Sequence, residues 1–320
     1  MLKRYFSKLN ICWIALTAAI FTLITLLMNV GIINSYYQIT LFDIGINIIL
    51  AVSLNLVIGV CGQFSLGHAG FMCIGAYSAA IMVRMMGNMM GLAVGVLIGI
   101  VISVIAALIV SIPTLRLRGD YLAIATLGFA EIIRIVVLNM DITNGAAGLT
   151  GIKKLTTWPL LFILMVISIM IVTNFGRSRQ GRACISIRED EIASEAMGIN
   201  TTRYKTTAFV IGAILASVAG ALYACSFYVI KPDLFTFNKS IDILVIVVFG
   251  GMGSMTGSVI AAIFVGVLNI ALQSLSSLRM VIYGVVLVAI MIFRPQGLLG
   301  TKEFTFSSLL KGKRKEKEKK

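Results

Sequence analysis

The chain has 320 residues, of which 59% are hydrophobic and only 12% are charged, and its mean hydropathy is +1.00. This composition excludes a soluble domain, which needs far more polar surface, and apolar runs of about twenty residues match the thickness of a bilayer. Because backbone groups in lipid must be hydrogen-bonded within their own segment, we predict an all-α, polytopic integral membrane helical bundle.

The net charge of +14 is unevenly distributed. Residues 311–320, KGKRKEKEKK, carry seven basic and two acidic side chains. We therefore predict a transmembrane domain over residues 1–310 and a basic, disordered cytoplasmic tail over 311–320. Such a tail indicates contact with anionic lipid rather than a nucleic-acid partner.

Apolar runs along the chain predict the membrane spans. The first run resembles a signal sequence but is too long and lacks a small-residue cleavage site, so we expect a retained span. The region 241–293 is interrupted at 250–257 and 273–279, which suggests three short crossings or re-entrant pieces and about ten spans with broken helices in total. The other candidate spans are 11–33, 39–60, 64–83, 91–113, 121–138, 158–175 and 207–230.

Three basic clusters set the expected orientation. They are the N-terminal Lys3, Arg4 and Lys8, the passage 174–206 with six basic and four acidic residues, and the lysine-rich tail. Ten spans place all three on the cytoplasmic side, in agreement with the positive-inside rule. A single crossing over 241–273 would put the tail outside, which the rule disfavours.

Two stretches rich in glycine and serine interrupt the apolar runs, one in each half of the chain. They are 61–75, CGQFSLGHAGFMCIG, and 250–257, GGMGSMTG. Paired helix breaks are typical of transporters built from inverted repeats, although small residues also serve close helix packing. The candidate translocation-path or helix-break residues are Asn47, Asn55, Gln63, Ser65, His68, Gly251, Gly253 and Ser254.

Few residues support enzymatic or metal chemistry. His68 is the one histidine, so a histidine-based zinc site is excluded, and no phosphate-binding loop motif occurs. Ser65 and His68 could form a nucleophile and base, but no carboxylate stands near them in sequence, and capping roles are favoured. We read the five cysteines as small buried residues without a disulfide framework: Cys12, Cys61, Cys73, Cys184 and Cys225.

Polar residues inside the spans are few. Asp43, Asn47 and Asn55 are spaced at multiples of four and share a helix face, which should avoid lipid. Glu131 and Arg134, at i and i+3, are predicted to neutralise each other as a structural pair rather than a proton relay. The loop 139–151 is either a turn-rich connection or a contact for an external partner or substrate.

The charged passage 174–206 predicts one short amphipathic helix. Its first turn would hold Glu189, Asp190 and Glu191, and Gly198 would end it. Ile192, Ala196 and Ile199 would form a narrow apolar stripe. That stripe could lie on lipid headgroups or dock into a groove on a soluble protein.

Several segments along the chain form a recognisable series of motifs. They are NLVIGVCGQFSLGHAGFMCIGAYSAA at 55–80, GDYLAIATLGFAEIIR at 119–134, NGAAGLTGI at 144–152 and GRACISIREDEIASEAMGINTTRYK at 181–205, followed by FGGMGSMTGSVIAA and IFRPQGLLG. Together they resemble the LivM-type permease family of branched-chain amino-acid ABC importers, and the likeness covers nearly the whole chain in order.

The resemblance implies an inverted-repeat permease subunit without catalytic residues or a cofactor of its own, since ATP-Mg would be bound by partner subunits. Expected partners are a second homologous permease, two cytoplasmic ATP-binding subunits and an external solute-binding protein. The implied location is a bacterial inner or plasma membrane, crossed several times, with both termini cytoplasmic.

The resemblance also implies a cargo and a contact for the ATPase. The cargo would be leucine, isoleucine and valine, with urea or short-chain amides as an alternative because their importers share this permease type. A third possibility is an ion-coupled secondary transporter acting alone. The family's cytoplasmic E-A-x-G core is matched by Glu195, Ala196 and Gly198 and flanked by Arg188 and Glu191, so these five are the expected ATPase-coupling residues.

Overall fold

The computed structural model describes residues 8–31, 34–114 and 120–271, with isolated positions 284, 285, 288, 297 and 300. Within these ranges the chain is helical, and the one β pairing is an isolated bridge between Leu149 and Ile230. The predicted all-α class is confirmed. The contacts divide the chain into two units, whose described residues lie within Met1–Gln38 and Ile39–Thr301.

In the first unit, α1 spans Lys8–Asn29, and α2 begins at Ser35 and runs into the second unit to Asn55. The remaining helices of the second unit are η2 (Leu56–Val60), α3 (His68–Met86), α4 (Met89–Thr114), α5 (Asp120–Asn139), η3 (Asp141–Thr143), η4 (Gly145–Ala147), α6 (Trp158–Arg177), α7 (Arg179–Glu189), α8 (Glu191–Ala196), α9 (Thr201–Phe227), η5 (Pro232–Phe235), α10 (Phe237–Gly250) and α11 (Met255–Ala271).

Six helical segments of the described residues are long and apolar enough to cross a bilayer. Ala15–Asn29 and Met255–Ala271 are shorter apolar helices. The predicted break at 273–279, any crossing after it and the tail 311–320 lie outside the described residues, so the total of about ten spans stays a prediction. The six segments are Tyr36–Val60, His68–Met86, Met89–Thr114, Tyr121–Asn139, Trp158–Arg177 and Thr201–Phe227.

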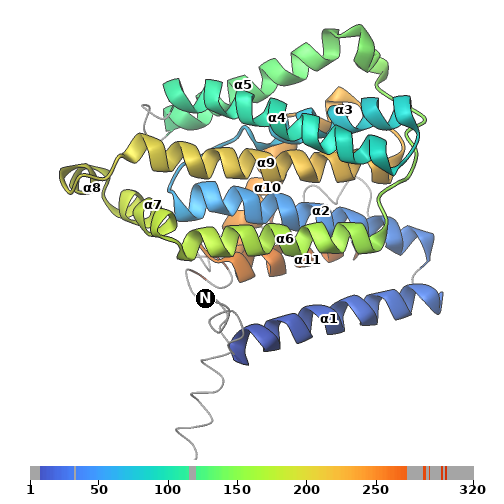
Figure 1. The fold of residues 1–320 in the computed structure, drawn as a ribbon, viewed down its shortest axis with the longest axis horizontal. Coiled ribbons are helices and arrows are strands. Elements are labelled where there is room, and N and C mark those ends of the chain that lie inside the picture. Colours follow the sequence, from blue (N-terminus) through green and yellow to red (C-terminus); the bar gives the residue numbers. More distant parts are fainter. Residues whose placement is uncertain are drawn as a thin grey trace, which may run out of the picture. The chain divides into compact units, whose positions relative to one another are not determined.

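The spans of α2, α3 and α9 are the most buried of the second unit, with α9 in the middle of the bundle in Figure 1. Small residues allow α3 and α9 to pack backbone to backbone. A Cβ on Gly75 would lie 1.9 Å from the Ser217 carbonyl oxygen, and one on Gly220 would lie 1.9 Å from that of Met72. In the spans of α2 and α9, 83% and 78% of the residues are buried, against 28% in those of α5 and α6. The outer helices therefore expose large faces to lipid or to other chains.

Two predicted boundaries are wrong for identifiable reasons. The span predicted at 64–83 is helical only from His68, because Gly62 has a positive φ of +70° and the chain from Gln63 to Gly67 is not helical. The span predicted at 207–230 begins earlier, at Thr201, because the Asn200 side chain accepts a hydrogen bond from the Arg203 N–H and caps α9.

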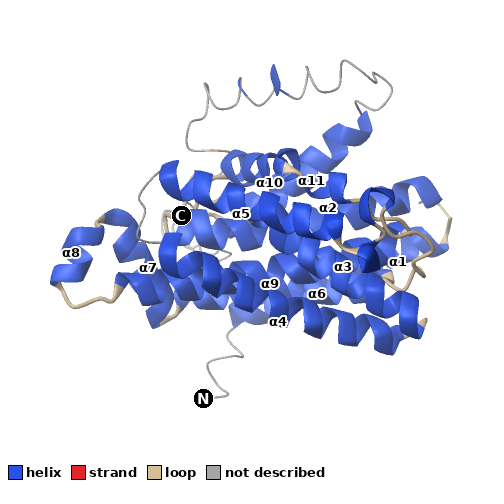
Figure 2. Ribbon diagram, turned by 90° about the horizontal axis from the view of Figure 1, so that it is seen from above, coloured by secondary structure: helices blue, strands red, loops and turns tan. Residues whose placement is uncertain are grey.

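The charged passage 174–206 is not one amphipathic helix as predicted. It holds the end of α6, the helices α7 and α8, and the first turns of α9. Figures 1 and 2 both show α7 and α8 projecting from one end of the bundle of the second unit. The four elements form a short helical extension beyond the apolar spans.

Candidate functional site: two helix breaks joined to the α7–α8 extension

The first break begins where α2 widens into η2, a π-helical turn over Leu56–Val60, before the chain reverses at Gly62. His68, the first residue of α3, lies with its Nε2 atom 2.7 Å from the Ser53 hydroxyl. Ser53 stands seven residues before Val60, the last residue of η2. At about 1.5 Å per residue, α3 therefore begins roughly 10 Å back from the end of η2, beside an earlier turn of α2. The break therefore returns into the bundle before α3 starts.

Side chains from other helices hold the start of α3. The hydroxyl of Thr126 in α5 accepts a hydrogen bond from the Leu66 N–H at 3.1 Å, and that of Ser240 in α10 accepts one from the Ala69 N–H at 3.2 Å. The Ser65 hydroxyl accepts a 3.4 Å hydrogen bond from the Gly67 N–H. His68 is paired with Ser53 rather than Ser65, and the Ser65 hydroxyl binds a backbone N–H, so the two predicted candidates do not form a nucleophile–base pair.

The second break separates α10 from α11. Gly251 and Gly253 have φ values of +106° and +94°, which side chains with a Cβ rarely adopt. The buried Asn55 side chain reaches this turn from α2. Its Oδ1 accepts a hydrogen bond from the Gly253 N–H at 2.8 Å, and its Nδ2 donates to the Ser254 carbonyl and the Ser258 hydroxyl, both at 2.9 Å. The two breaks, far apart in sequence, thus lie against each other.

Gly59 makes this contact possible. A Cβ at this position would lie 2.0 Å from Asn55 Oδ1 and 2.3 Å from the Gly253 nitrogen. Real Cβ atoms do not approach other atoms so closely, so any larger residue would push the two breaks apart.

Arg188, near the end of α7, reaches both breaks. Its Nη1 atom donates to the Gly59 carbonyl oxygen at 2.5 Å, and a Cβ on Gly253 would lie 3.3 Å from the same nitrogen. Its Nε and Nη2 atoms pair with the Glu189 carboxylate at 3.1 and 2.5 Å. We call Asn55, Gly59, Arg188, Gly253 and Ser254 the inner polar knot. Hydrogen bonds of the Asn55 and Arg188 side chains connect the two breaks at these residues.

A thiol contact lies beside the knot. The thiol of Cys61, directly after η2, hydrogen-bonds to Cys184 of α7 and lowers the pKa of Cys184. Cys61, Cys73, Cys184 and Cys225 are all buried and free, as predicted, and the Cys12 side chain is outside the described residues. The contact places α7 directly against the end of the first break.

The predicted coupling residues brace the extension. Glu191 Oε1 lies 2.6 Å from Lys205 Nζ, and Glu195 Oε1 accepts a 2.7 Å hydrogen bond from the Thr201 hydroxyl. Both contacts tie α8 to the start of α9. The Ser186 and Ser194 hydroxyls lie 2.8 Å apart and tie α8 to α7.

The predicted start and stop of the helix are largely confirmed. Asp190 caps α8 by accepting a hydrogen bond from the Ala193 N–H at 3.0 Å, and Gly198, with a φ of +81°, follows the helix end. Glu189 is an exception, because it is the last residue of α7 and not part of the first turn of α8.

The apolar side chains of α8 face away from the chain. Ile192 is 67% exposed, Ala196 is exposed and Ile199 is only half-buried. Met197, which the sequence pattern missed, is 82% exposed. A span can expose such residues to lipid, but α8 lies among charged residues at the tip of the extension, so these side chains form an apolar surface without a partner within the described chain.

Asn47 and Gln63 lie apart from the contacts of the inner polar knot. Asn47 donates to the Asp43 carboxylate at 2.9 Å and accepts from Lys239 Nζ at 3.1 Å. The Gln63 side chain is 2% exposed, and neither of its polar atoms has a hydrogen-bond partner among the described residues. Gln63 is therefore a buried polar group that this conformation leaves unpaired.

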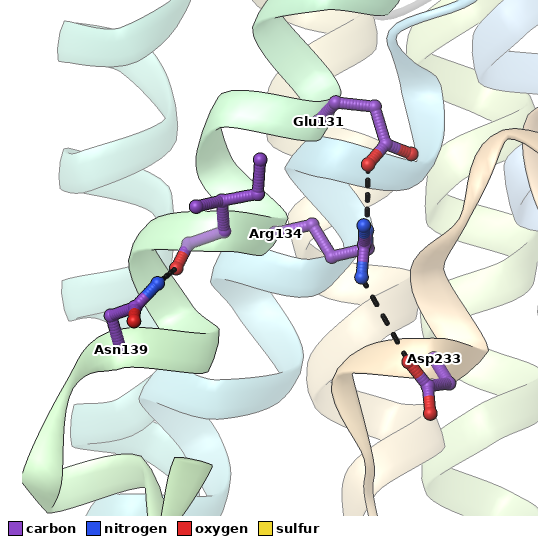
Figure 3. Close-up of polar contacts among 5 residues, drawn as sticks. Glu131, Arg134, Asn139 and Asp233 are labelled. Atoms are coloured by element: carbon purple, nitrogen blue, oxygen red, sulfur yellow. Dashed lines mark hydrogen bonds and ion pairs between the residues drawn. The ribbon is translucent and has the colours of Figure 1, made fainter. Parts of the chain in front are cut away.

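A second charged cluster lies on α5 (Figure 3). Arg134 Nε is 2.7 Å from Glu131 Oε2, which confirms the predicted pair, and Arg134 Nη1 is 3.8 Å from Asp233 Oδ1 in η5. We call these three residues the α5 charge cluster. The sequence did not reveal Asp233, because it follows Arg134 by about a hundred residues and stands in a short polar connection.

The predicted loop 139–151 is ordered by internal hydrogen bonds. The Thr143 hydroxyl donates to the Val137 carbonyl at 2.5 Å, and the Asn144 side chain donates to the Gly148 carbonyl at 3.1 Å. The backbones of Leu149 and Ile230 then pair in the isolated bridge. Its suggested contact with a partner or a substrate stays a prediction.

The family comparison matches most of the chain. Residues 36–291 match the model described as branched-chain amino acid transport system / permease component. No solved structure matches the chain.

Individual relatives are of two kinds. The chain is 37% identical over 289 residues to the high-affinity branched-chain amino acid transport system permease protein LivM of Escherichia coli strain K12, covering 79% of this chain and 68% of the relative. It is also 33% identical over 152 residues to the permease protein LivH of the same organism, covering 46% and 49% of the two chains. A probable LivM of Methanocaldococcus jannaschii is 23% identical over 220 residues, covering 61% and 64%.

Proposed function

Because this chain belongs to the family of branched-chain amino acid transport permease components, we propose that it translocates leucine, isoleucine and valine as one subunit of an ATP-driven importer. The permease is a multi-pass membrane protein and a transport rather than a catalytic subunit. Its similarity to both LivM and LivH supports a second, homologous permease as its partner.

The α7–α8 extension is the proposed contact for an ATP-binding subunit. The observation that carries this proposal is the combination of an exposed apolar tip, at Ile192 and Met197, with an inward arginine at the other end of the same extension. An amphipathic helix that docks into a groove buries such apolar side chains. Movement of the tip would then reach the membrane helices through Arg188.

To transmit movement from its tip to Arg188, the α7–α8 extension must be rigid. The Glu191–Lys205 ion pair and the Glu195–Thr201 hydrogen bond fix α8 to α9, and the Ser186–Ser194 contact fixes it to α7. Because each contact joins different elements, the extension would move as one body. A ligand-driven change also needs contacts that differ between the two states. The inner polar knot is the proposed place where they differ.

The inner polar knot would act as the cytoplasmic gate. In this conformation Asn55 and Arg188 hold the two breaks together, and Gln63 is left without a hydrogen-bond partner. A buried unpaired amide is costly, so we expect Gln63 to gain a partner when the breaks separate. This assigns Gln63, Ser65, His68 and the glycine turn at 251–253 to the moving wall of the path.

The rest of the assembly follows from the transporter type. Two cytoplasmic ATP-binding subunits would supply the energy with bound ATP-Mg, and an external solute-binding protein would deliver the amino acid. The proposed topology has about ten spans and both termini in the cytoplasm, with residues 1–310 as the permease domain. It places the α7–α8 extension on the cytoplasmic side.

Reconstitution tests this function. The chain, its neighbouring permease, the ATP-binding subunits and the binding protein are assembled in proteoliposomes, and uptake of radiolabelled leucine is followed with and without ATP. We expect ATP-dependent uptake that isoleucine and valine inhibit and urea does not. Uptake by this chain alone, driven by a proton or sodium gradient and insensitive to ATP depletion, would instead identify a secondary transporter.

The docking role of the extension has its own test. Met197→Asp and Gly198→Pro should abolish co-purification of the ATP-binding subunit and ATP-driven uptake, because one charges the apolar tip and the other alters the turn after α8. Asp141→Asn, an exposed acid outside the extension, is the control. Unchanged co-purification and uptake in both variants would show that the extension is not the docking site.

A further inference from the structure

The α5 charge cluster stands where charges are rare. Glu131 lies near the middle of the span Tyr121–Asn139, and Arg134 lies one turn further along. Charged side chains at this depth are expensive in lipid and normally face protein or a water-filled path. The span of α4, Met89–Thr114, carries no charged residue at all, so its exposed face is suited to lipid and that of α5 is not.

The cluster is open rather than buried. The side chains of Arg134 and Glu131 are 21% and 30% exposed, and that of Asp233 is 79% exposed. Helix stability alone gives little reason for such a pair, because partly exposed ion pairs at i and i+3 contribute little to stability. An open charged cluster in a span is therefore expected to contact something outside this chain.

The cluster has unused binding capacity for both signs of charge. Arg134 uses Nε for Glu131 and points Nη1 toward Asp233 at the long distance of 3.8 Å, while Nη2 has no partner among the described residues. A guanidinium binds carboxylates through two adjacent N–H groups. The loosely held Asp233 carboxylate remains available as an acceptor for an ammonium group.

An apolar strip adjoins the charges on the same helix. Ile124, Gly128, Glu131 and Ile135 follow one another at spacings of four and three residues and so share a face of α5. Both isoleucines are exposed, and a Cβ added to Gly128 would find nothing within 4 Å. The strip therefore offers apolar surface and room for a small aliphatic side chain beside the charged groups.

We propose that this face of α5 is a binding site for the zwitterionic head and aliphatic side chain of an α-amino acid during its passage. Arg134 receives the α-carboxylate, Asp233 with Glu131 receives the α-ammonium group, and the strip around Gly128 receives the side chain. The inference rests on the proposed function, which supplies the amino acid as cargo and a second permease as the facing wall. The α5 face would bind the amino acid directly, a role that the helix breaks do not have in the proposed function.

Thiol labelling tests the site in the assembled transporter. Gly128→Cys adds a reporter, and the four described native cysteines are buried, so the unsubstituted chain gives the background. A charged, membrane-impermeant thiol reagent should label Gly128→Cys but not Val101→Cys, which is an exposed position of α4. Absence of labelling at Gly128→Cys would place this face against lipid or tightly packed protein and overturn the proposal.

Three ligands then test what the site recognises. Leucine should slow the labelling of Gly128→Cys, whereas leucinamide, which lacks the carboxylate, and 4-methylpentanoate, which lacks the ammonium group, should slow it far less at equal concentration. Loss of one charge-assisted contact should weaken protection roughly 10- to 100-fold. Equal protection by all three compounds, or by none, would contradict recognition of a zwitterion.

Charge reversal separates binding from a structural role. Arg134→Gln and Asp233→Asn should each weaken leucine protection, and the double reversal of Glu131→Arg with Arg134→Glu should not restore it, because the ligand's charges would meet the wrong partners. A merely structural pair would be rescued by the reversal. If wild-type assemblies take up leucine with ATP and these variants match the wild type in uptake and in leucine protection, only this inference fails. If the wild type takes up no leucine, the proposed function fails.

Discussion

The inner polar knot and the α5 charge cluster are both polar groups in an apolar protein, but they are built in opposite ways. In the knot, the Asn55 side chain is buried, and both of its polar atoms are bound within the chain. In the cluster, Asp233 is 79% exposed and its contact with Arg134 is long. The difference teaches that the knot serves contacts inside the molecule, whereas the cluster is left open for contacts outside it.

This comparison predicts that changes in the knot act on folding and coupling, and that changes in the cluster act on the amino acid. Each of the following substitutions is paired with a control that leaves the contact in question intact. They are ordered from the largest expected effect to the smallest.

Asn55→Leu should have the largest effect. It leaves the Gly253 N–H, the Ser254 carbonyl and the Ser258 hydroxyl without their partner, at a cost of about 3 kcal/mol or more for the buried groups together. We expect a clear fall in the melting temperature of the purified protein and loss of uptake. Asn139→Leu, at an exposed helix end, should leave the melting temperature nearly unchanged. Equal melting curves for the two variants would remove the structural role of the knot.

Gly59→Ala should come next. Its Cβ would overlap Asn55 and the Gly253 backbone, and such overpacking costs roughly 1–3 kcal/mol. Gly176→Ala is the matched control near the end of α6, where an added Cβ meets nothing within 4 Å. We expect a lower melting temperature for Gly59→Ala only. Similar values for both alanine variants would show that the breaks do not need this close approach.

Arg188→Lys should separate ATP hydrolysis from transport. A lysine keeps the charge but cannot contact Glu189 and the Gly59 carbonyl through one planar group. We expect assembly and ATP hydrolysis to persist while leucine uptake per ATP falls roughly tenfold, as for the loss of one charge-assisted hydrogen bond. Arg182→Lys, on an exposed part of α7, should retain wild-type coupling. A normal uptake-to-ATP ratio for Arg188→Lys would rule out its transmitting role.

Glu195→Ala should have the smallest effect. It removes the acceptor of the Thr201 hydroxyl and loosens α8, so affinity for the ATP-binding subunit should fall a few-fold, by about 1 kcal/mol. Glu195→Gln keeps an acceptor and should bind nearly as well as wild type. Titration of the ATP-binding subunit onto the purified permeases measures both. If glutamine and alanine were equally weak, the carboxylate charge rather than the Thr201 contact would matter.

The sequence predicted the membrane class and most helices because apolar runs reflect the bilayer directly. It also predicted a helix that starts near Asp190 and stops at Gly198, which are local signals, although the capping role of Asp190 came from the structure. It could not predict that Asn55 joins the two breaks or that Arg188 reaches Gly59, because both contacts join residues more than a hundred positions apart. The passage was predicted to hold one helix but holds two, because Asp190 ends α7 and caps α8 at the same position.

The division between the two regions can be tested by one measurement, the leucine concentration that half-protects Gly128→Cys from a charged thiol reagent in the assembled transporter. Adding Arg134→Gln should raise this concentration about tenfold or more, the effect of one lost charge-assisted contact. Adding Arg188→Lys should leave it unchanged while uptake per ATP falls. An unchanged value with Arg134→Gln, or a raised one with Arg188→Lys, would contradict the separation of amino-acid binding on α5 from coupling at the knot.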